Sequence, residues 1–159
     1  MDPSGKFAYI SRYDNDCISA FTIDPATGTL AAMAGSPFAA GDGPGGIAIN
    51  PSGTFAYVGY SDSISAFTID AATGALAEVP GSQYATQHRP GLLNIDPTGK
   101  FAYALNADSD TISAFSINPV TGALVALAGS PFATQESPHH LTICPSGRFV
   151  YVLGVGRIS

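Results

Sequence analysis

The chain has 159 residues, of which 45% are hydrophobic and 10% aromatic, so it carries enough apolar material for one globular core and lacks the polarity of a disordered chain. Charged residues make up only 11%, the formal net charge is −6, and Lys and Arg form no cluster, which argues against nucleic acids and anionic membrane surfaces as partners. The 18 glycines and 12 prolines favour turns and short strands, and therefore an all-β protein.

The first ten residues have neither the basic nor the apolar part of a secretion signal, and no apolar run reaches the roughly 20 residues that cross a bilayer. We therefore expect no membrane span. Met1 directly precedes a motif that recurs along the chain. This suggests a segment of a longer protein, and the sequence leaves its cellular location open.

A repeat of 46 to 48 residues organises the whole chain. Each copy starts with a tetrapeptide, continues with an aromatic alternation such as Phe-Ala-Tyr and an ISAFTID-like run, and ends with a turn and an AGSPFA-like segment. The copies, which we treat as one domain, are 2–49, 50–95, 96–143 and the partial 144–159.

Period-2 alternation of large and small side chains, bounded by Pro, Gly, Asp and Asn, predicts four strands in each period. In the middle copy they are strand a at 46–50, strand b at 54–60, strand c at 64–70 and strand d at 76–84. Four strands in about 46 residues are typical of a propeller blade. The sequence thus predicts an all-β fold, a β-propeller segment of about three four-stranded antiparallel blades plus part of a fourth.

Strand b indicates how the blades stack. Phe55 and Tyr57 share one face and Ala56 and Val58 the other, so a bulky face can meet a small-residue face of the next blade. After strand c, the turn at 24–28 and its copies combine Pro or Ala with a closing Gly that suits a left-handed conformation.

The loops between strands divide into a constant and a variable set. In a propeller the a–b and c–d turns emerge at one end, and these are nearly identical in all copies. The b–c and d–a loops emerge at the other end and vary, which makes that end the expected seat of function. The b–c loops are 11–16, 61–63, 106–110 and 154–157, and the d–a loops are 41–46, 87–92 and 135–140.

All three histidines fall in the variable loops. His139 and His140 beside Glu136 could hold a metal or move protons, although a polar loop tip needs no function. His88 and Arg89 could bind an anionic substrate, or they could be solvated loop residues.

Other polar residues give weaker signals. The acidic pairs in 14–16 and 108–110 lack the closing Glu of a calcium loop and are better explained as short turns. Cys17 and Cys144 fit no metal-binding spacing and are expected to be unpaired. We therefore predict no metal and no cofactor.

The phrases GPGGIAINPSGTFAYV (43–58), DPATGTL (24–30) and AGSPFA (34–39) resemble the β-propeller lactonase family. This group comprises the 6-phosphogluconolactonase-like and carboxymuconate-cyclising propellers and the related surface propellers with YVTN-type repeats. The resemblance covers the whole chain and implies a lactonase-like propeller.

Lactonase members carry Pro-Arg-His before strand a and Asn-Glu after strand b in some blades. The first motif is similar to Pro138-His139-His140, so the resemblance gives His140 the motif histidine, and Asn106 matches the asparagine. The glutamate is absent, because its positions hold Tyr13, Ser61, Ala107 and Val155. Lactone opening needs an activated water, so the rest of such an active site is expected on blades outside this chain.

Two functions follow. The first is a lactone hydrolase or cyclising lyase for a small sugar acid or carboxylated acid, with His140 and His139 as catalytic residues and His88, Arg89, Asn106 and Arg12 as substrate-binding residues. The second is a non-catalytic propeller that binds a protein or glycan through the same d–a and b–c loop face.

The number of periods raises a further expectation. Closed propellers have typically four to eight blades, so about three blades leave two apolar faces open. Either missing blades of a six- or seven-bladed protein or a second copy in a homodimer would have to cover them.

Overall fold

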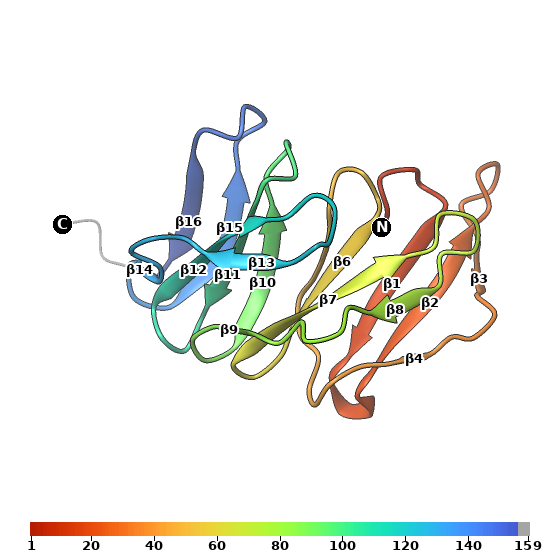
Figure 1. Ribbon diagram of the computed structural model, residues 1–159, viewed down its shortest axis with the longest axis horizontal. Helices are drawn as coiled ribbons and strands as arrows, with labels where there is room; N and C mark the ends of the chain where they lie inside the picture. Colours follow the sequence, from red (N-terminus) through yellow and green to blue (C-terminus); the bar gives the residue numbers. More distant parts are fainter. Residues whose placement is uncertain (156–159) are drawn as a thin grey trace.

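The computed structural model describes residues 1–155, which form four antiparallel sheets. The sheets follow one another side by side in chain order, from the red end to the blue end of the ribbon in Figure 1. This arrangement confirms the predicted all-β propeller segment.

Each sheet is one blade or part of one. The first holds β1 (Phe7–Arg12), β2 (Cys17–Ile23), β3 (Leu30–Ala32) and β4 (Phe38–Ala39), with the short helix η1 (Tyr13–Asn15) between β1 and β2. The second holds β5 (Ile47–Ile49), β6 (Phe55–Gly59), β7 (Ser63–Ile69), β8 (Leu76–Glu78) and β9 (Tyr84–Ala85). The third holds β10 (Pro90–Ile95), β11 (Phe101–Asn106), β12 (Thr111–Ile117), β13 (Leu124–Ala126) and β14 (Phe132–Ala133). The fourth holds β15 (Pro138–Ile143) and β16 (Val150–Gly154).

The repeat and the blade are out of phase by one strand. Each sequence copy supplies strands b, c and d of one blade and strand a of the next, so within residues 1–155 only the second and third sheets contain all four strands. The first sheet lacks strand a, and the fourth consists of strands a and b.

Strand d differs from the prediction, because it is two short strands instead of one. In the second blade β8 pairs with one end of β7 and β9 with the other. Between them the backbone leaves the sheet, and the hydroxyl of Ser82 accepts the hydrogen bond of the Ala66 amide at 3.1 Å. A serine side chain thus satisfies a strand c amide that a continuous strand d would have paired. Two serines repeat this bond in the other copies: Ser36 to Ala20 and Ser130 to Ala114.

The apolar core lies between blades. Tyr57 pairs with Ala66 across the sheet, and Ala56 pairs with Phe67, so each face carries large residues on one strand and small ones on the next. The Ala56 face packs on the first blade and the Tyr57 face on the third. The predicted separation of large and small side chains onto opposite faces is confirmed for strand b. Strand c has the opposite arrangement, so each face of the sheet carries large side chains from one strand and small side chains from the other.

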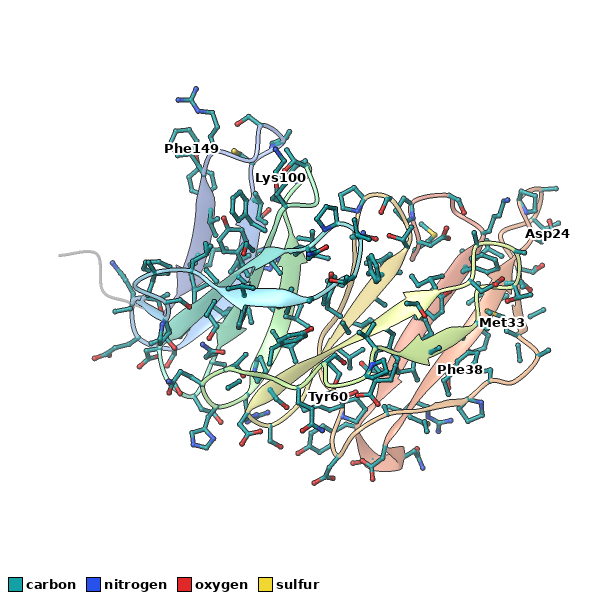
Figure 2. All side chains as sticks on the ribbon, in the orientation of Figure 1. Asp24, Met33, Phe38, Tyr60, Lys100 and Phe149 are labelled. Carbon is teal, nitrogen blue, oxygen red and sulfur yellow. The ribbon has the colours of Figure 1, made fainter. Side chains whose placement is uncertain are left out.

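The constant turns and the variable loops lie at opposite ends of the blades, as expected. Asp24 and Lys100, which mark a c–d and an a–b turn, lie at the upper end of Figure 2, whereas Tyr60 lies at the lower end with the b–c and d–a loops. Gly28, at the close of the first c–d turn, has the predicted positive φ of 71°.

The outer faces of the two end blades expose large apolar side chains. Ile10 and Leu30 are 50% and 54% exposed, and Phe149, Tyr151 and Leu153 are 56% to 58% exposed. None of the helices in residues 1–155 is long and apolar enough to span a membrane.

Candidate functional site

Strand a of the second, third and fourth blades is β5, β10 and β15, and these three strands form the inner wall of the row of blades. β10 packs against both β5 and β15, and the Asn94 side chain donates a hydrogen bond of 2.8 Å to the Leu141 carbonyl oxygen between neighbouring inner strands. Each of these strands is entered through a fully buried proline, namely Pro44, Pro90 and Pro138. The d–a loops are therefore anchored at the rim, while the residues before and after each proline are free to vary.

The predicted catalytic histidines lie on the innermost strand of the last blade. His139 and His140 are exposed on β15, where a register shift between Pro138 and His140 leaves His139 in a bulge. The Nδ1 atom of His139 is 3.4 Å from the Ser137 carbonyl oxygen. In the repeat, His140 corresponds to Leu92 of the third blade, so one inner-wall position changes from aliphatic to imidazole between neighbouring blades.

Arg89 and His88 lie in the preceding d–a loop and are exposed. The Arg89 guanidinium is 3.6 Å from the Asp108 carboxylate, with side-chain exposures of 72% and 50%. An ion pair this exposed is screened by water and contributes little, so Arg89 can exchange Asp108 for an anionic ligand. Arg89 also lines a small cleft of about 100 Å³ together with Tyr13 and Tyr60.

Asn106 is brought close to Arg89 but is closed off from solvent. Its backbone is paired with Pro90 at the end of β11, and its side chain is 0% exposed. The amide nitrogen donates to the hydroxyls of Thr111 and Ser113 at 3.0 and 2.9 Å. The side-chain oxygen has no hydrogen-bond partner within residues 1–155, so a buried acceptor is left over beside the rim.

The remaining predicted positions lie apart from this group. Arg12 is exposed at the end of β1, two blades away from Asn106, and the equivalent b–c loop of the fourth blade reaches into residues 156 and 157, outside the described residues. The structure thus gathers Arg89 and Asn106, places His139 and His140 on the adjoining inner strand, and leaves Arg12 on the first blade.

Two acidic residues of the long b–c loops hold the neighbouring d–a loops through hydrogen bonds. Asp16 accepts a hydrogen bond of 2.9 Å from the Gly43 amide, and Asp110 accepts one of 2.8 Å from the Ser137 amide. Each carboxylate fixes the d–a loop that follows its blade. Nowhere in residues 1–155 do three or more His, Cys, Asp or Glu side chains gather in a way that could hold a metal ion.

A second cavity, which the sequence did not predict, lies at the same end between the first and second blades. We call it the Tyr60 cleft. It has a volume of about 410 Å³, and the side chains that matter to it are Asp42, Tyr60, Asp62, Ser65, Glu78 and Gln83. One feature of the sequence could have indicated this cleft: the second copy of the repeat differs from the other two copies at several of these positions.

The Tyr60 hydroxyl is buried on the floor of this cleft without a hydrogen-bond partner in the described chain. Burial raises its pKa, and the negative charge of Glu78 raises it further. The Gly41 amide and the Ser65 hydroxyl lie near enough to offset part of that rise, although neither meets the phenol in hydrogen-bond geometry. A neutral phenol is therefore held at the base of an acidic cleft.

The chain is similar to a family of known proteins and to several solved structures. The family model described as lactonase, 7-bladed beta-propeller matches residues 1–84 and, in an overlapping match, residues 32–137. A comparison with curated proteins found no match.

Two of the solved structures that share the fold have a sequence identity to this chain of 25% or more. A protein from Bacteroides uniformis ATCC 8492, whose inferred activity is 6-phosphogluconolactonase, is 26% identical, with a TM-score of 0.77 over 96% of this chain and 42% of its own. A protein from Bacteroides fragilis NCTC 9343 with the same inferred activity is 25% identical, with a TM-score of 0.73 over 84% of this chain and 37% of its own.

A third structure, the periplasmic gluconolactonase of Pseudomonas aeruginosa, shares the fold at 20% identity, with a TM-score of 0.75 over 98% of this chain and 42% of its own. The chain thus spans about two fifths of the length of these proteins. With the family model covering most of its length, the chain belongs to the lactonase family of seven-bladed β-propellers.

Proposed function

We propose that the chain forms part of the catalytic propeller of a lactone hydrolase that acts on the lactone of a small sugar acid or carboxylated acid. The observation that carries the proposal is the pair of exposed histidines on β15, beside the inner strand whose entry loop presents Arg89. Membership of the lactonase family and the resemblance to the 6-phosphogluconolactonase-like protein of B. uniformis support it.

In this proposal His140 exchanges protons and Arg89 binds negative charge. Imidazole accepts and returns protons near neutral pH, so His140 takes a proton from the water that attacks the lactone carbonyl. The ring C–O bond then breaks, and the released alkoxide oxygen receives the proton, which leaves a hydroxy acid. The guanidinium of Arg89 pairs with a carboxylate or phosphate on the substrate.

Hydrolysis of glucono-δ-lactone and of its 6-phospho derivative by the complete propeller that contains this chain, followed as proton release at constant pH, tests this function. We expect turnover above the uncatalysed rate, and His140→Gln to lower kcat about 100-fold or more, as loss of a general base does. Arg89→Gln should raise KM for the phosphorylated lactone more than for the neutral one. A wild-type rate equal to the uncatalysed one, or equal rates for wild type and His140→Gln, would overturn the proposal.

A second candidate is a propeller that binds a ligand at this loop face without catalysis. The residue after Asn106 favours it, because Ala107 supplies no carboxylate where lactonases of the family carry a glutamate. This candidate predicts saturable binding of a sugar acid in the absence of turnover, which the same proteins and an equilibrium titration would reveal.

A further inference from the structure

The small cleft beside Arg89, which we call the Arg89 cleft, lies at the loop end where loops of three blades meet. Its volume is about 100 Å³, and its lining includes Tyr13 from the first b–c loop, Ser61 from the second, and Arg89 from the d–a loop that leads into the third blade. Sites that enclose a whole small molecule have roughly 300 Å³ or more. The cleft therefore accommodates one group of a ligand, and the rest of that ligand lies on the exposed side chains at its border.

Tyr13 borders the cleft as an exposed aromatic ring that is held in place. It follows β1 in the short helix η1 and is 65% exposed. Its ring lies against Gly43, where a methyl group would be 3.0 Å from a ring carbon, so even alanine would press on the ring. The Gly43 amide donates its hydrogen bond to the Asp16 carboxylate, which ties the two loops together. A tyrosine fixed in this way offers a rigid contact surface at low cost in conformational entropy.

The combination of an aromatic ring with a glycine beneath it is specific to the first copy of the repeat. The second and third copies have serine and alanine at the position of Tyr13, and arginine and serine at the position of Gly43. Neither residue is therefore part of the framework that the blades share. Because the ring is mostly exposed, it is not part of the apolar core either.

Arg89 brings a positive charge to the cleft from a fixed backbone position. The residue before the buried proline has a positive φ in all three d–a loops: 60° at Gly43, 53° at Arg89 and 51° at Ser137. The fold sets this conformation, so the side chain at this position can vary. Among the residues within 1–155 that line the cleft, Arg89 alone is charged, and its exposed partner Asp108 can be replaced by an anion.

The two side chains suit two different parts of one ligand. The face of an aromatic ring is negative and attracts the partly positive C–H groups on one side of a sugar ring. The guanidinium of Arg89 binds a phosphate or carboxylate. A closed ring presents its C–H groups as one rigid face, whereas an open chain has to give up rotational freedom before it can do so.

We propose that Tyr13 is a specificity-determining residue that favours the closed ring of an anionic sugar lactone over the open-chain hydroxy acid formed by hydrolysis. Arg89 holds the anionic group in both. The inference rests on the proposed function, because the ring and the open chain are its substrate and product. It assigns to Tyr13 the selective release of product: opening of the ring removes the contact with Tyr13 and leaves the contact with Arg89.

Calorimetric titration of the complete propeller that contains this chain tests the proposal. The ligands are D-glucose 6-phosphate, which is a closed ring, and 6-phosphogluconate, which is an open chain, and neither has a lactone bond to hydrolyse. We expect Tyr13→Ala to weaken binding of glucose 6-phosphate about fivefold, since it removes the aromatic face, and binding of 6-phosphogluconate less than twofold. Tyr13→Phe keeps that face and should restore wild-type affinity for the ring. Arg89→Gln should weaken both ligands by similar factors.

Three results would overturn the proposal: a wild-type propeller that does not bind glucose 6-phosphate, equal effects of Tyr13→Ala on the two ligands, and equal losses in Tyr13→Phe and Tyr13→Ala, which would mean that the hydroxyl makes the contact. Binding is measured without turnover, so the two proposals fail separately. Lactone hydrolysis combined with an unchanged affinity of Tyr13→Ala for glucose 6-phosphate would remove only the role of Tyr13. The expected Tyr13 effect without hydrolysis would remove only the catalytic function.

Discussion

The hydroxyl of Tyr57 in β6 donates a hydrogen bond of 2.9 Å to the carbonyl oxygen of Gly122, in the c–d turn of the next blade. One blade earlier, Tyr9 makes the same bond to Gly74 at 2.7 Å. Burial raises the pKa of Tyr9 to about 12, with a smaller contribution from the charge of Asp2, so the phenol remains a donor at neutral pH. The aromatic alternation of strand b thus joins successive blades.

Tyr57→Phe should destabilise the chain. Removing the hydroxyl leaves the Gly122 carbonyl without this donor, and the loss expected for a buried bond is about 1–2 kcal/mol of unfolding free energy. Tyr103→Phe is the matched control, because the Tyr103 hydroxyl makes no hydrogen bond within residues 1–155, and it should cost less than about 0.5 kcal/mol. Urea unfolding of both variants measures the difference, and equal losses would contradict the role assigned to the Tyr57 bond.

Gly122→Ala should be more damaging than Gly28→Ala. Both glycines close a c–d turn at φ values of 73° and 71°, so each substitution incurs the backbone strain of about 1–2 kcal/mol expected for a left-handed non-glycine residue. A methyl group on Gly122 would lie 2.5 Å from the Phe55 ring of the preceding blade, whereas none of the described atoms lies within 4 Å of one on Gly28. Comparison of the two melting temperatures measures packing between blades, and identical shifts would show that strain alone matters.

The acid sensitivity of folding should depend on Asp96. Burial acts to raise the pKa of this carboxyl, but hydrogen bonds from the Thr98 hydroxyl and the amides of Phe101, Thr98 and Lys100 outweigh it and leave the pKa below its ordinary value of 3.8. The folded state therefore binds a proton less readily than the unfolded chain. The resulting stability is present above the unfolded pKa and lost as the pH falls through the folded one.

Asp96→Asn tests this dependence. Asn50 occupies the same position in the second copy and accepts the Thr54 and Phe55 amides at 2.9 and 3.0 Å, so asparagine can retain part of the network without titrating. Urea unfolding at neutral and acid pH should show a smaller acid loss in the variant than in the wild type. An identical acid loss would exclude Asp96 as its source.

Cys144 should be more reactive than an ordinary thiol. A hydrogen bond with the Ser146 hydroxyl lowers its pKa below the usual 9.0; slight burial opposes this, and the amides of Phe149, Arg148 and Ser146 add to the lowering. Thiolate is the reactive form, so iodoacetamide should modify Cys144 with a pH midpoint lower in the folded chain than in urea. Buried Cys17 should react slowly until unfolding. A Cys144 midpoint unchanged by urea would contradict this prediction.

The sequence predicted the parts of the fold that depend on local pattern. Strands b and c follow from period-2 alternation, and the c–d turns follow from a glycine that can adopt positive φ. The break in strand d was not predicted, because it depends on the Ser82 hydroxyl reaching an amide 16 residues earlier in the chain. Local periodicity contains no information on that contact.

The sequence predicted at which end of the blades the candidate residues lie, but not which of them are accessible to solvent. Differences among the copies correctly separated the variable b–c and d–a loops from the constant turns, and the roles of His140 and Arg89 stay predictions. The burial of Asn106 could not be foreseen, because it depends on hydroxyls that β12 brings to the end of β11. The Tyr60 cleft was missed because a shortened loop becomes a cavity only when two blades pack.

The most direct test of the central claim, that function lies at the b–c and d–a loop end, is a ¹H–¹⁵N titration of the chain with 6-phosphogluconate, the product of the proposed reaction. We predict saturable shifts of the Arg89, Gly91, His139 and His140 amides, with the c–d turns at 24–28, 70–74 and 118–122 unaffected. Shifts centred on those turns, or no saturable shift at the loop end, would contradict the account.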